Sequence, residues 1–197
     1  MTRDKILDAA ALEIERNGLT QFRVKRVALE AGISVALLYS YFEDREGLIA
    51  ATMVHRYRQV LIGNAETFTT PLLSVETTDD LRRALTTIIS EAQTPERNEA
   101  RVLRIEGMSF AQHNLTASTG IAAAKEEVGE LIASRVQPLA EKNLLAEGMS
   151  GIAFARIWYA LFFGQIAVDG EKNLALSSSE WLQALHVIAN SMVRADS

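Results

Sequence analysis

Residues 24–42 read VKRVALEAGISVALLYSYF, and the spacing of small, apolar and turn-forming residues in this stretch decides the fold. Val27 and Ala31 stand about one helical turn apart and are expected to face a core. Gly32 supplies the positive φ that ends a first helix, and Ser34 can cap the start of a second. The stretch therefore predicts a helix-turn-helix.

The second helix of this motif is expected to begin near Val35 and to end near Phe42. Leu38 and Phe42 are four residues apart and share an inward face, which leaves the other side chains near the outside. In a helix-turn-helix, the start of this helix meets base edges in the DNA major groove while flanking groups hold phosphates. A plain helical hairpin with a terminal glycine is the alternative, although it would rarely satisfy all these steric requirements together.

The residues on either side extend the pattern. Residues 4–17 form an amphipathic helix that ends at Asn17-Gly18, and a further helix is expected over residues 45–58. The positions that carry the wider pattern are Gly18, Val24, Val27, Ala28, Ala31, Gly32, Ile33, Ser34, Leu38, Tyr39, Tyr41, Phe42 and Leu48. With this pattern, about the first quarter of the chain resembles the tetracycline-repressor (TetR/AcrR) family of one-component bacterial regulators.

The resemblance implies an N-terminal DNA-binding domain over residues 1–45 and a helical ligand-binding and dimerisation domain over residues 46–197. It also implies that Tyr39 and Tyr41 are phosphate-binding aromatics and that Arg45 stands where the family usually has a phosphate-binding lysine. The full set of expected DNA contacts is Arg23, Lys25, Ser34, Val35, Ala36, Leu37, Tyr39, Ser40, Tyr41 and Arg45.

Two departures from the family pattern affect these contacts. Arg23 stands where the family often has a threonine that caps the first motif helix and touches phosphate. Leu37 replaces a frequent threonine, and the pair Val35-Ala36 replaces frequent polar or glycine residues. Because this helix carries few hydrogen-bond donors, we expect thymine-methyl packing and DNA shape to provide more of the specificity than bidentate bonds to bases.

Composition limits the class of protein. The 197 residues include no cysteine, which rules out disulfides and thiolate metal sites and fits a reducing compartment. No apolar run is judged to approach a membrane span and no secretory signal is recognised, so a cytoplasmic location is expected. Residues 1–58 hold nine Lys and Arg against eight Asp and Glu, and the rest hold eleven against seventeen. Such a chain is expected to bind non-specific DNA weakly.

The remainder of the chain reads as helices separated by short breaks, which makes the predicted fold all-α. A break is expected over residues 64–78, because Pro71 lies in a Thr- and Ser-rich stretch. Helices follow over residues 79–92, 95–111 and 116–136, and Pro138 is expected to kink or restart the last of these. Residues 151–168 are apolar almost all the way round and must be covered on two sides. Ser177 and Glu180 have capping-box spacing before a final helix.

The family comparison implies a homodimer whose last two helices pair with their copies in a four-helix bundle. Two copies of the motif could then grip successive major grooves of a palindromic operator, and a small effector that prefers wrongly spaced copies would release the DNA. Aromatic and polar residues that interrupt apolar helical faces are the candidates for a mostly apolar or aromatic effector. They are Met108, Phe110, His113, Trp158, Phe162, Phe163 and Gln165.

Other functions find less support in the sequence. The three histidines show no metal spacing, there is no glycine-rich phosphate loop, and neither an enzyme nor a cofactor is expected. The acidic side chains near Glu126 are expected to form the solvated side of a helix and not a metal site. A helical adaptor that uses the motif for protein contacts remains an alternative, as does an activator in place of a repressor.

Overall fold

A computed structural model describes residues 2–168 and 177–195 of the chain. Within these ranges the regular structure is helical, and the single β contact is an isolated antiparallel bridge between Leu145 and Val193. The all-α fold predicted from the sequence is therefore confirmed.

The chain divides into two compact units. The first combines Met1–Leu61 with Leu103–Lys125, and the second combines Ile62–Val102 with Glu126–Ser197. Three helices continue from one unit into the other: α4 (Arg45–Thr69), α6 (Pro95–Ala111) and α7 (Leu115–Glu141). The boundary expected near residue 45 remains a prediction.

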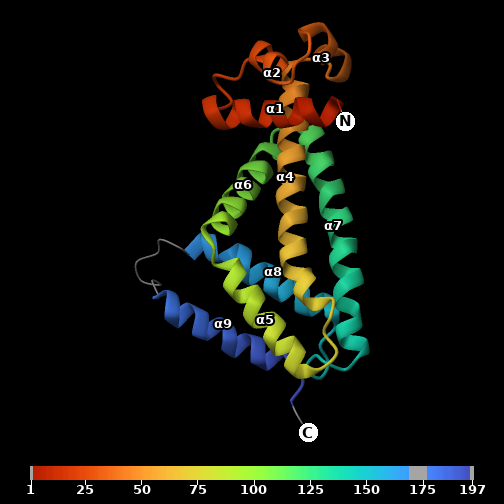
Figure 1. Ribbon diagram of the computed structural model, residues 1–197, viewed down its shortest axis with the longest axis vertical. Helices are drawn as coiled ribbons and strands as arrows, with labels where there is room; N and C mark the ends of the chain where they lie inside the picture. Colours follow the sequence, from red (N-terminus) through yellow and green to blue (C-terminus); the bar gives the residue numbers. More distant parts are fainter. Residues whose placement is uncertain (1, 169–176, 196–197) are drawn as a thin grey trace. The chain divides into compact units, whose positions relative to one another are not determined.

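The first unit is built from α1 (Thr2–Asn17), α2 (Val24–Glu30), α3 (Val35–Tyr41) and the adjoining parts of the three shared helices (Figure 1). Its apolar core takes side chains from α1, α2, α3 and α4. Glycines allow the shared helices to come close, because a Cβ on Gly107 would lie 2.7 Å from the Tyr57 ring and one on Gly120 would lie 2.8 Å from Val54.

Helix α4 is longer than its sequence indicated. The break expected from residue 64 is wrong in its start, because the helix continues to Thr69 and is followed by a 3-10 turn, η1 (Thr70–Leu72), that contains Pro71. The hydroxyls of Thr67 and Thr69 donate to the carbonyls of Gly63 and Ala65, at 2.9 and 2.7 Å. Threonine side chains can be accommodated in a helix in this way, and burial of Thr69 overrides its low helix propensity.

The second unit holds α5 (Thr78–Ala92), α8 (Gly151–Val168) and α9 (Ser178–Met192), together with the other parts of the shared helices. Helices α5 and α9 lie side by side (Figure 1). Leu85 of α5, Trp158 of α8 and Leu185 of α9 are buried in one apolar core. A Cβ on Gly151 would lie only 2.4 Å from the Val136 carbonyl oxygen, so this glycine lets α8 begin directly against α7.

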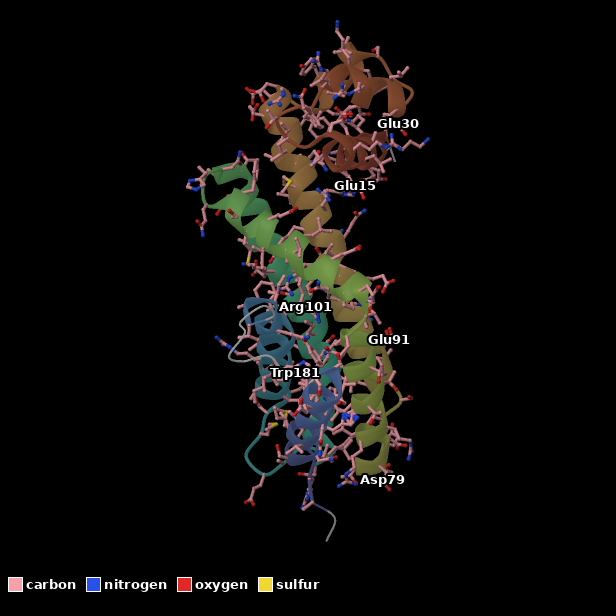
Figure 2. The ribbon with its side chains drawn as sticks, turned by 90° about the vertical axis from the view of Figure 1, so that its left-hand side faces the viewer. Glu15, Glu30, Asp79, Glu91, Arg101 and Trp181 are labelled. Carbon is pink, nitrogen blue, oxygen red and sulfur yellow. The ribbon has the colours of Figure 1, made fainter. Side chains whose placement is uncertain are left out.

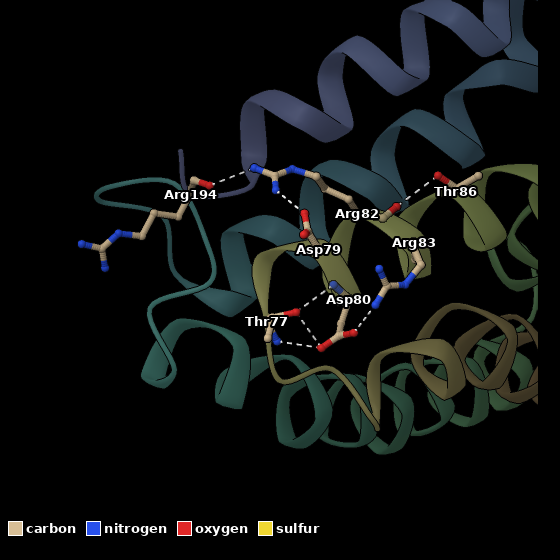
Figure 3. Close-up of polar contacts among 7 residues, drawn as sticks. All are labelled: Thr77, Asp79, Asp80, Arg82, Arg83, Thr86 and Arg194. Carbon is tan, nitrogen blue, oxygen red and sulfur yellow. Dashed lines mark hydrogen bonds and ion pairs between the residues drawn. The ribbon is translucent and has the colours of Figure 1, made fainter. Parts of the chain in front are cut away.

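A group of polar contacts fixes the start of α5 (Figure 3). The Thr77 hydroxyl accepts a hydrogen bond from the Asp80 backbone N–H at 3.1 Å, and the Asp80 carboxylate accepts one from the Thr77 backbone N–H at 2.9 Å. Arg82 bonds to Asp79 and also donates to the Arg194 carbonyl, 112 residues away in sequence. The capping box therefore starts the helix, and Arg82 ties it to the segment after α9.

Other helix ends follow the sequence closely. Pro95 begins α6, Ser150 caps α8 by accepting from Ala153 N–H at 3.1 Å, and Ser177 forms the expected capping box with Glu180. Of the kink or restart expected at Pro138, the restart is wrong, because α7 includes Pro138 and ends at Glu141; the kink stays a prediction. Proline removes one backbone donor in this last turn, and the surrounding bonds continue with Lys142 N–H donating to the Pro138 carbonyl.

Helix α8 has one buried face and one exposed apolar face. Phe154, Ala155 and Trp158 are buried, whereas Ile152, Ile157, Tyr159 and Val168 are exposed. Contrary to the sequence expectation, α8 has the length and apolar composition of a membrane span, which core helices of soluble proteins also have. The sequence predicted that α8 would be covered on two sides. Within the described residues one side is covered, and the other side is exposed.

Candidate nucleic-acid interface

The turn between α2 and α3 has the geometry that the motif requires. Gly32 has φ of +67°, a conformation that side chains with a Cβ rarely adopt. The N–H of Ile33 donates to the Ala28 carbonyl at 2.9 Å and closes the end of α2. At the other side of the turn, the Ser34 hydroxyl accepts from the Leu37 N–H at 3.1 Å and caps α3. Both local predictions are confirmed by these contacts.

One face of helix α3 packs against the core of the first unit, and the opposite face is exposed to solvent. Leu38 is 0% exposed and Phe42, just after the helix, is buried, so these two side chains fix the helix to the core. In contrast, the exposed fractions of Leu37, Tyr39 and Tyr41 are 42%, 42% and 43%. A seven-residue helix with two anchors and an exposed outer face can enter a groove without unfolding its own core.

The predicted DNA-contact residues fall into two groups by exposure. Val35 and Arg45 are partly buried. The other eight, all exposed, are Arg23, Lys25, Ser34, Ala36, Leu37, Tyr39, Ser40 and Tyr41. These residues come from α2, α3 and the residues that flank them. Their contacts with DNA remain predictions.

The hydroxyl groups of the two serines in the motif are already used within the protein. Ser34 caps α3, and the Ser40 hydroxyl donates to the Leu37 carbonyl at 2.7 Å. The outward surface of α3 is therefore mainly that of Ala36, Leu37 and the two tyrosines. This arrangement supports the expectation that direct hydrogen bonds to bases contribute little and that apolar contacts and phosphate contacts contribute more.

Arg45, at the first position of α4, is held in place by several contacts. Its guanidinium donates to the Leu19 carbonyl at 2.9 Å, pairs with Glu46 and lies 5.6 Å from the centre of the Phe22 ring. Because the side chain is only partly buried, N–H groups can still face solvent. A phosphate at this position would meet an arginine whose conformation is already restricted.

Glu13 is a residue of this interface that the sequence gave no reason to single out. It is 6% exposed, and it accepts from Arg26 Nε at 2.8 Å, from the Arg23 backbone N–H at 3.0 Å and from Asn17 at 2.9 Å. The side-chain bond from Arg26 holds the pKa of Glu13 below its ordinary value, against the effect of burial. Its role depends on contacts up to thirteen residues away, which no local pattern indicates.

Glu13 also bonds the backbone at the start of α2, where Arg23 stands in place of the capping threonine that is frequent in the family. The Arg23 side chain makes no capping bond to α2, as its type suggested. Its backbone N–H is instead satisfied by the carboxylate of Glu13 on α1. Arg26 is committed to the same carboxylate, so Lys25 is the exposed cation of α2 without a hydrogen bond or ion pair among the described residues.

A second unpredicted residue is Arg3, near the start of α1. Its guanidinium lies 5.4 Å from the centre of the Phe42 ring, at the end of α3, and the side chain is exposed. It adds a positive charge beside the end of the recognition helix. Only the packing of α1 against the motif could have indicated this position.

The predicted effector residues do not form one group. Met108, Phe110 and His113 lie in the first unit, where Phe110 packs against the core of the DNA-binding motif and His113 is exposed. Trp158, Phe162, Phe163 and Gln165 lie on α8 in the second unit. Trp158 stacks on Phe162 at 5.2 Å, whereas Phe163 stacks on the exposed Tyr159. All seven remain candidates for an effector site.

Residues 6–52 match the family described as bacterial regulatory proteins, tetR family. The match to the TetR family therefore lies in the N-terminal region of this chain. The resemblance inferred from the sequence is thus confirmed. A related protein is the HTH-type transcriptional regulator BetI of Brucella canis, which is 29% identical over 119 residues; the match covers 59% of this chain and 50% of BetI. The chain therefore matches only half the length of that relative.

Solved structures share the fold over nearly the whole chain. A protein from Mesorhizobium loti assigned to the TetR family has a TM-score of 0.66 at 17% identity, covering 96% of this chain and 93% of that one. A transcriptional regulator from Saccharomonospora viridis, solved in complex with choline, has a TM-score of 0.62 at 17% identity and covers 97% of each chain. At these identities the similarity shows a common fold, which extends beyond the N-terminal residues that match the family.

Proposed function

We propose that this TetR-family chain is a cytoplasmic transcriptional regulator that binds a palindromic operator as a homodimer and responds to a small effector. The observation that carries the proposal is the presentation of α3, which Leu38 and Phe42 hold by one face while Leu37, Tyr39 and Tyr41 remain exposed. A helix that is anchored on one side and exposed on the other has the arrangement by which a helix-turn-helix places side chains in the DNA major groove.

The test is a DNA-binding titration. Fluorescence anisotropy with the DNA upstream of the chain's own gene should show sequence-selective binding that weakens as salt rises. Tyr39→Phe and Arg45→Ala should weaken binding to matched and mismatched operators nearly alike, because phosphate contacts carry no base preference. Arg83→Gln, a change at an exposed residue of α5, is the matched control. An adaptor that binds protein through the motif would show no selective binding, and that result would refute the proposal.

Dimerisation is supported by the exposed apolar side chains of the last two helices. Ile152, Ile157 and Tyr159 on α8 and Val187 on α9 are exposed, and a surface of this kind favours a second protein surface over water. A second copy is the occupant that a palindromic operator requires, because a twofold dimer presents two recognition helices. A membrane could also cover α8, but burying the charged Arg156 of this helix in a membrane would be costly.

Sedimentation velocity separates these possibilities. Ile157→Asp should shift the protein from dimer to monomer, because it buries a charge in the proposed interface. Leu115→Asp is the control, since Leu115 is more exposed than Ile157 but lies on α7 in the first unit. A wild-type protein that is monomeric at micromolar concentration, or that binds vesicles, would contradict the proposed dimer.

Release by an effector follows from thermodynamic linkage. A small molecule that favours a dimer with wrongly spaced recognition helices weakens operator binding by the same factor by which DNA weakens the small molecule. The choline held by the Saccharomonospora viridis protein supports a small-molecule effector for a chain of this fold. A reporter gene behind the selected operator would distinguish a repressor from an activator, since deletion of the regulator raises expression in the first case and lowers it in the second.

A further inference from the structure

Much of the positive charge of the first unit is paired within the protein. Residues 1–58 hold nine Lys and Arg against eight Asp and Glu. Three of the arginines form ion pairs with carboxylates of the same unit, and these are Arg16, Arg26 and Arg45. Because DNA is first attracted through its phosphates, a cation beside α3 that has no carboxylate partner in the protein should contribute more to DNA binding than a paired one.

Arg3 is such a cation. It lies in the first turn of α1 and its side chain is exposed. Its guanidinium forms no hydrogen bond or ion pair with the residues that the structure describes, and its contact is with the ring of Phe42, 5.4 Å away at the ring centre. A cation–π contact of this kind restricts a guanidinium but leaves its N–H donors available for an anion.

The position of Arg3 is set by the end of the recognition helix. Phe42 is the residue that ends α3, and it is buried in the core of the motif. Figure 1 shows the N-terminal end of α1 close to α3. In helix-turn-helix proteins the start of the recognition helix meets base edges, whereas residues at its other end can contact the sugar–phosphate backbone. Arg3 is therefore placed where a backbone phosphate would lie.

A second arginine of the first unit lies against an aromatic ring in the same way. Arg45 lies 5.6 Å from the centre of the Phe22 ring, and it begins α4 three residues after Phe42. Arg45 also donates to the Leu19 carbonyl and pairs with Glu46. Arg3 has neither kind of partner among the described residues, so more of its hydrogen-bonding capacity is left for DNA.

We infer that Arg3 binds a phosphate of the operator backbone at the C-terminal end of α3, with the Phe42 ring holding its guanidinium in place. This inference rests on the proposed function, because it adds a contact to the same DNA interface. The family match begins at residue 6 and so does not include Arg3. A planar guanidinium fork suits a phosphate, and a twofold dimer would make the contact once in each half-site.

Reading of bases in the minor groove is the alternative role for an arginine near the N-terminus. Arginines that act in this way are carried on arms that reach into the groove. Arg3 is instead part of helix α1, and its guanidinium lies against a ring that belongs to the core of the motif. This arrangement favours a phosphate contact, whose loss has no dependence on base sequence.

The first experiment measures operator binding by fluorescence anisotropy at several salt concentrations, with the full-length protein. Arg3→Gln should weaken binding about 10- to 100-fold, as expected for loss of a charge-assisted hydrogen bond, and equally for matched and mismatched operators. The slope of log affinity against log salt should fall by about 0.9 for each lost phosphate contact, or about 1.8 for a dimer. Arg3→Lys keeps the charge and should retain part of the affinity.

Lys5→Gln is the matched control. It removes the same charge from an exposed position of the same helix, two residues from Arg3 and so on a different side of α1. Its affinity for the operator should stay within about 2-fold of wild type, because screening by salt weakens charges that touch no phosphate. Circular dichroism and thermal unfolding check that both variants are folded.

The second experiment locates the phosphate. Operators in which a single phosphate is replaced by a neutral methylphosphonate should lose affinity for the wild type wherever a phosphate is contacted. With Arg3→Gln, one of these positions in each half-site should cease to matter, because the side chain that it met is gone. Lys5→Gln should keep the wild-type pattern of sensitive positions.

Three results would overturn the inference: equal affinities of Arg3→Gln and Lys5→Gln, a loss in Arg3→Gln that depends on one base pair, or a methylphosphonate pattern that Arg3→Gln leaves unchanged. These failures differ from a failure of the proposed function. If Tyr39→Phe and Arg45→Ala weaken binding while Arg3→Gln does not, the regulator stands and the role of Arg3 is refuted. Absence of selective binding by the wild type would refute both.

Discussion

The two units differ in the partners of their buried and partly buried charged side chains. In the first, the buried carboxylate of Glu13 is bound by Arg26, by Asn17 and by the backbone of Arg23. In the second, Arg97 and Arg135 rest on amide and hydroxyl oxygens. A buried charge with its counter-charge in the same chain acts as a structural tie, whereas hydrogen bonds to neutral oxygens hold a charge without compensating it.

The largest expected effect is loss of the Glu13 tie. Glu13→Ala should lower the free energy of unfolding by about 3 kcal/mol, toward the low end for a broken buried pair because Arg26 is 43% exposed on its side chain and can regain water. Urea denaturation followed by circular dichroism measures it. Glu15→Ala, a change at an exposed acid two residues away on α1, should be nearly neutral (Figure 2). If Glu13→Ala and Glu15→Ala lowered the free energy of unfolding equally, the Glu13 contacts would not be a special source of stability in the first unit.

Acid should abolish the same contribution. The folded-state pKa of Glu13 is lowered from 4.5, with the Arg26 hydrogen bond as the main cause. A lowered pKa gives stability that is complete above 4.5 and is lost as pH falls through the folded-state pKa. The stability difference between wild type and Glu13→Gln should therefore be constant near neutral pH and shrink on acidification below 4.5. Because other carboxylates are common to both proteins, a pH-independent difference would show that ionisation of Glu13 is not the source.

The cap of α3 should have a smaller effect on stability but a clear one on DNA binding. Ser34→Ala removes the acceptor for the Leu37 N–H and should cost about 1 kcal/mol. Ser150→Ala removes the corresponding cap of α8 in the second unit and serves as the matched control. Both should lower the thermal midpoint, but only Ser34→Ala should weaken operator binding in anisotropy titrations. Loss of DNA affinity in both would indicate a general loss of folded protein.

The smallest effect on stability is expected at Arg97 and Arg135. The double variant Arg97→Gln and Arg135→Gln should change the free energy of unfolding by less than about 1 kcal/mol, because it removes both hydrogen bonds and the cost of burying charge. Urea denaturation without added ligand measures it beside Glu13→Ala. A loss as large as that of Glu13→Ala would show that these arginines are structural ties like Arg26.

Local features of this protein were predictable from the sequence. The turn at Gly32 and the caps at Ser34, Ser150 and Ser177 depend on bonds that close within five residues, and the structure contains all of them. The exposed face of α3 also followed from its helical spacing, because two apolar residues four apart leave only one buried stripe. The N-terminal match over residues 6–52 agrees with this local pattern.

Features that depend on distant residues were not predictable in the same way. Helix α4 continues through a Thr-rich stretch because Thr69 is buried and bonded by Arg135, 66 residues later. The seven effector candidates are divided between two units, since apolar periodicity shows which face of a helix is buried and not what buries it.

By itself, the sequence determined the all-α fold, the helix-turn-helix and the N-terminal resemblance to the TetR family, because helix periods, caps and a glycine turn are short-range properties. The tertiary structure alone decided which charges are neutralised: Glu13 meets Arg26, while Arg97 and Arg135 meet hydroxyl and amide groups. The reason is physical, since the energy of a buried charge depends on the partners that folding brings within a few ångströms, and these partners lie far apart in the chain.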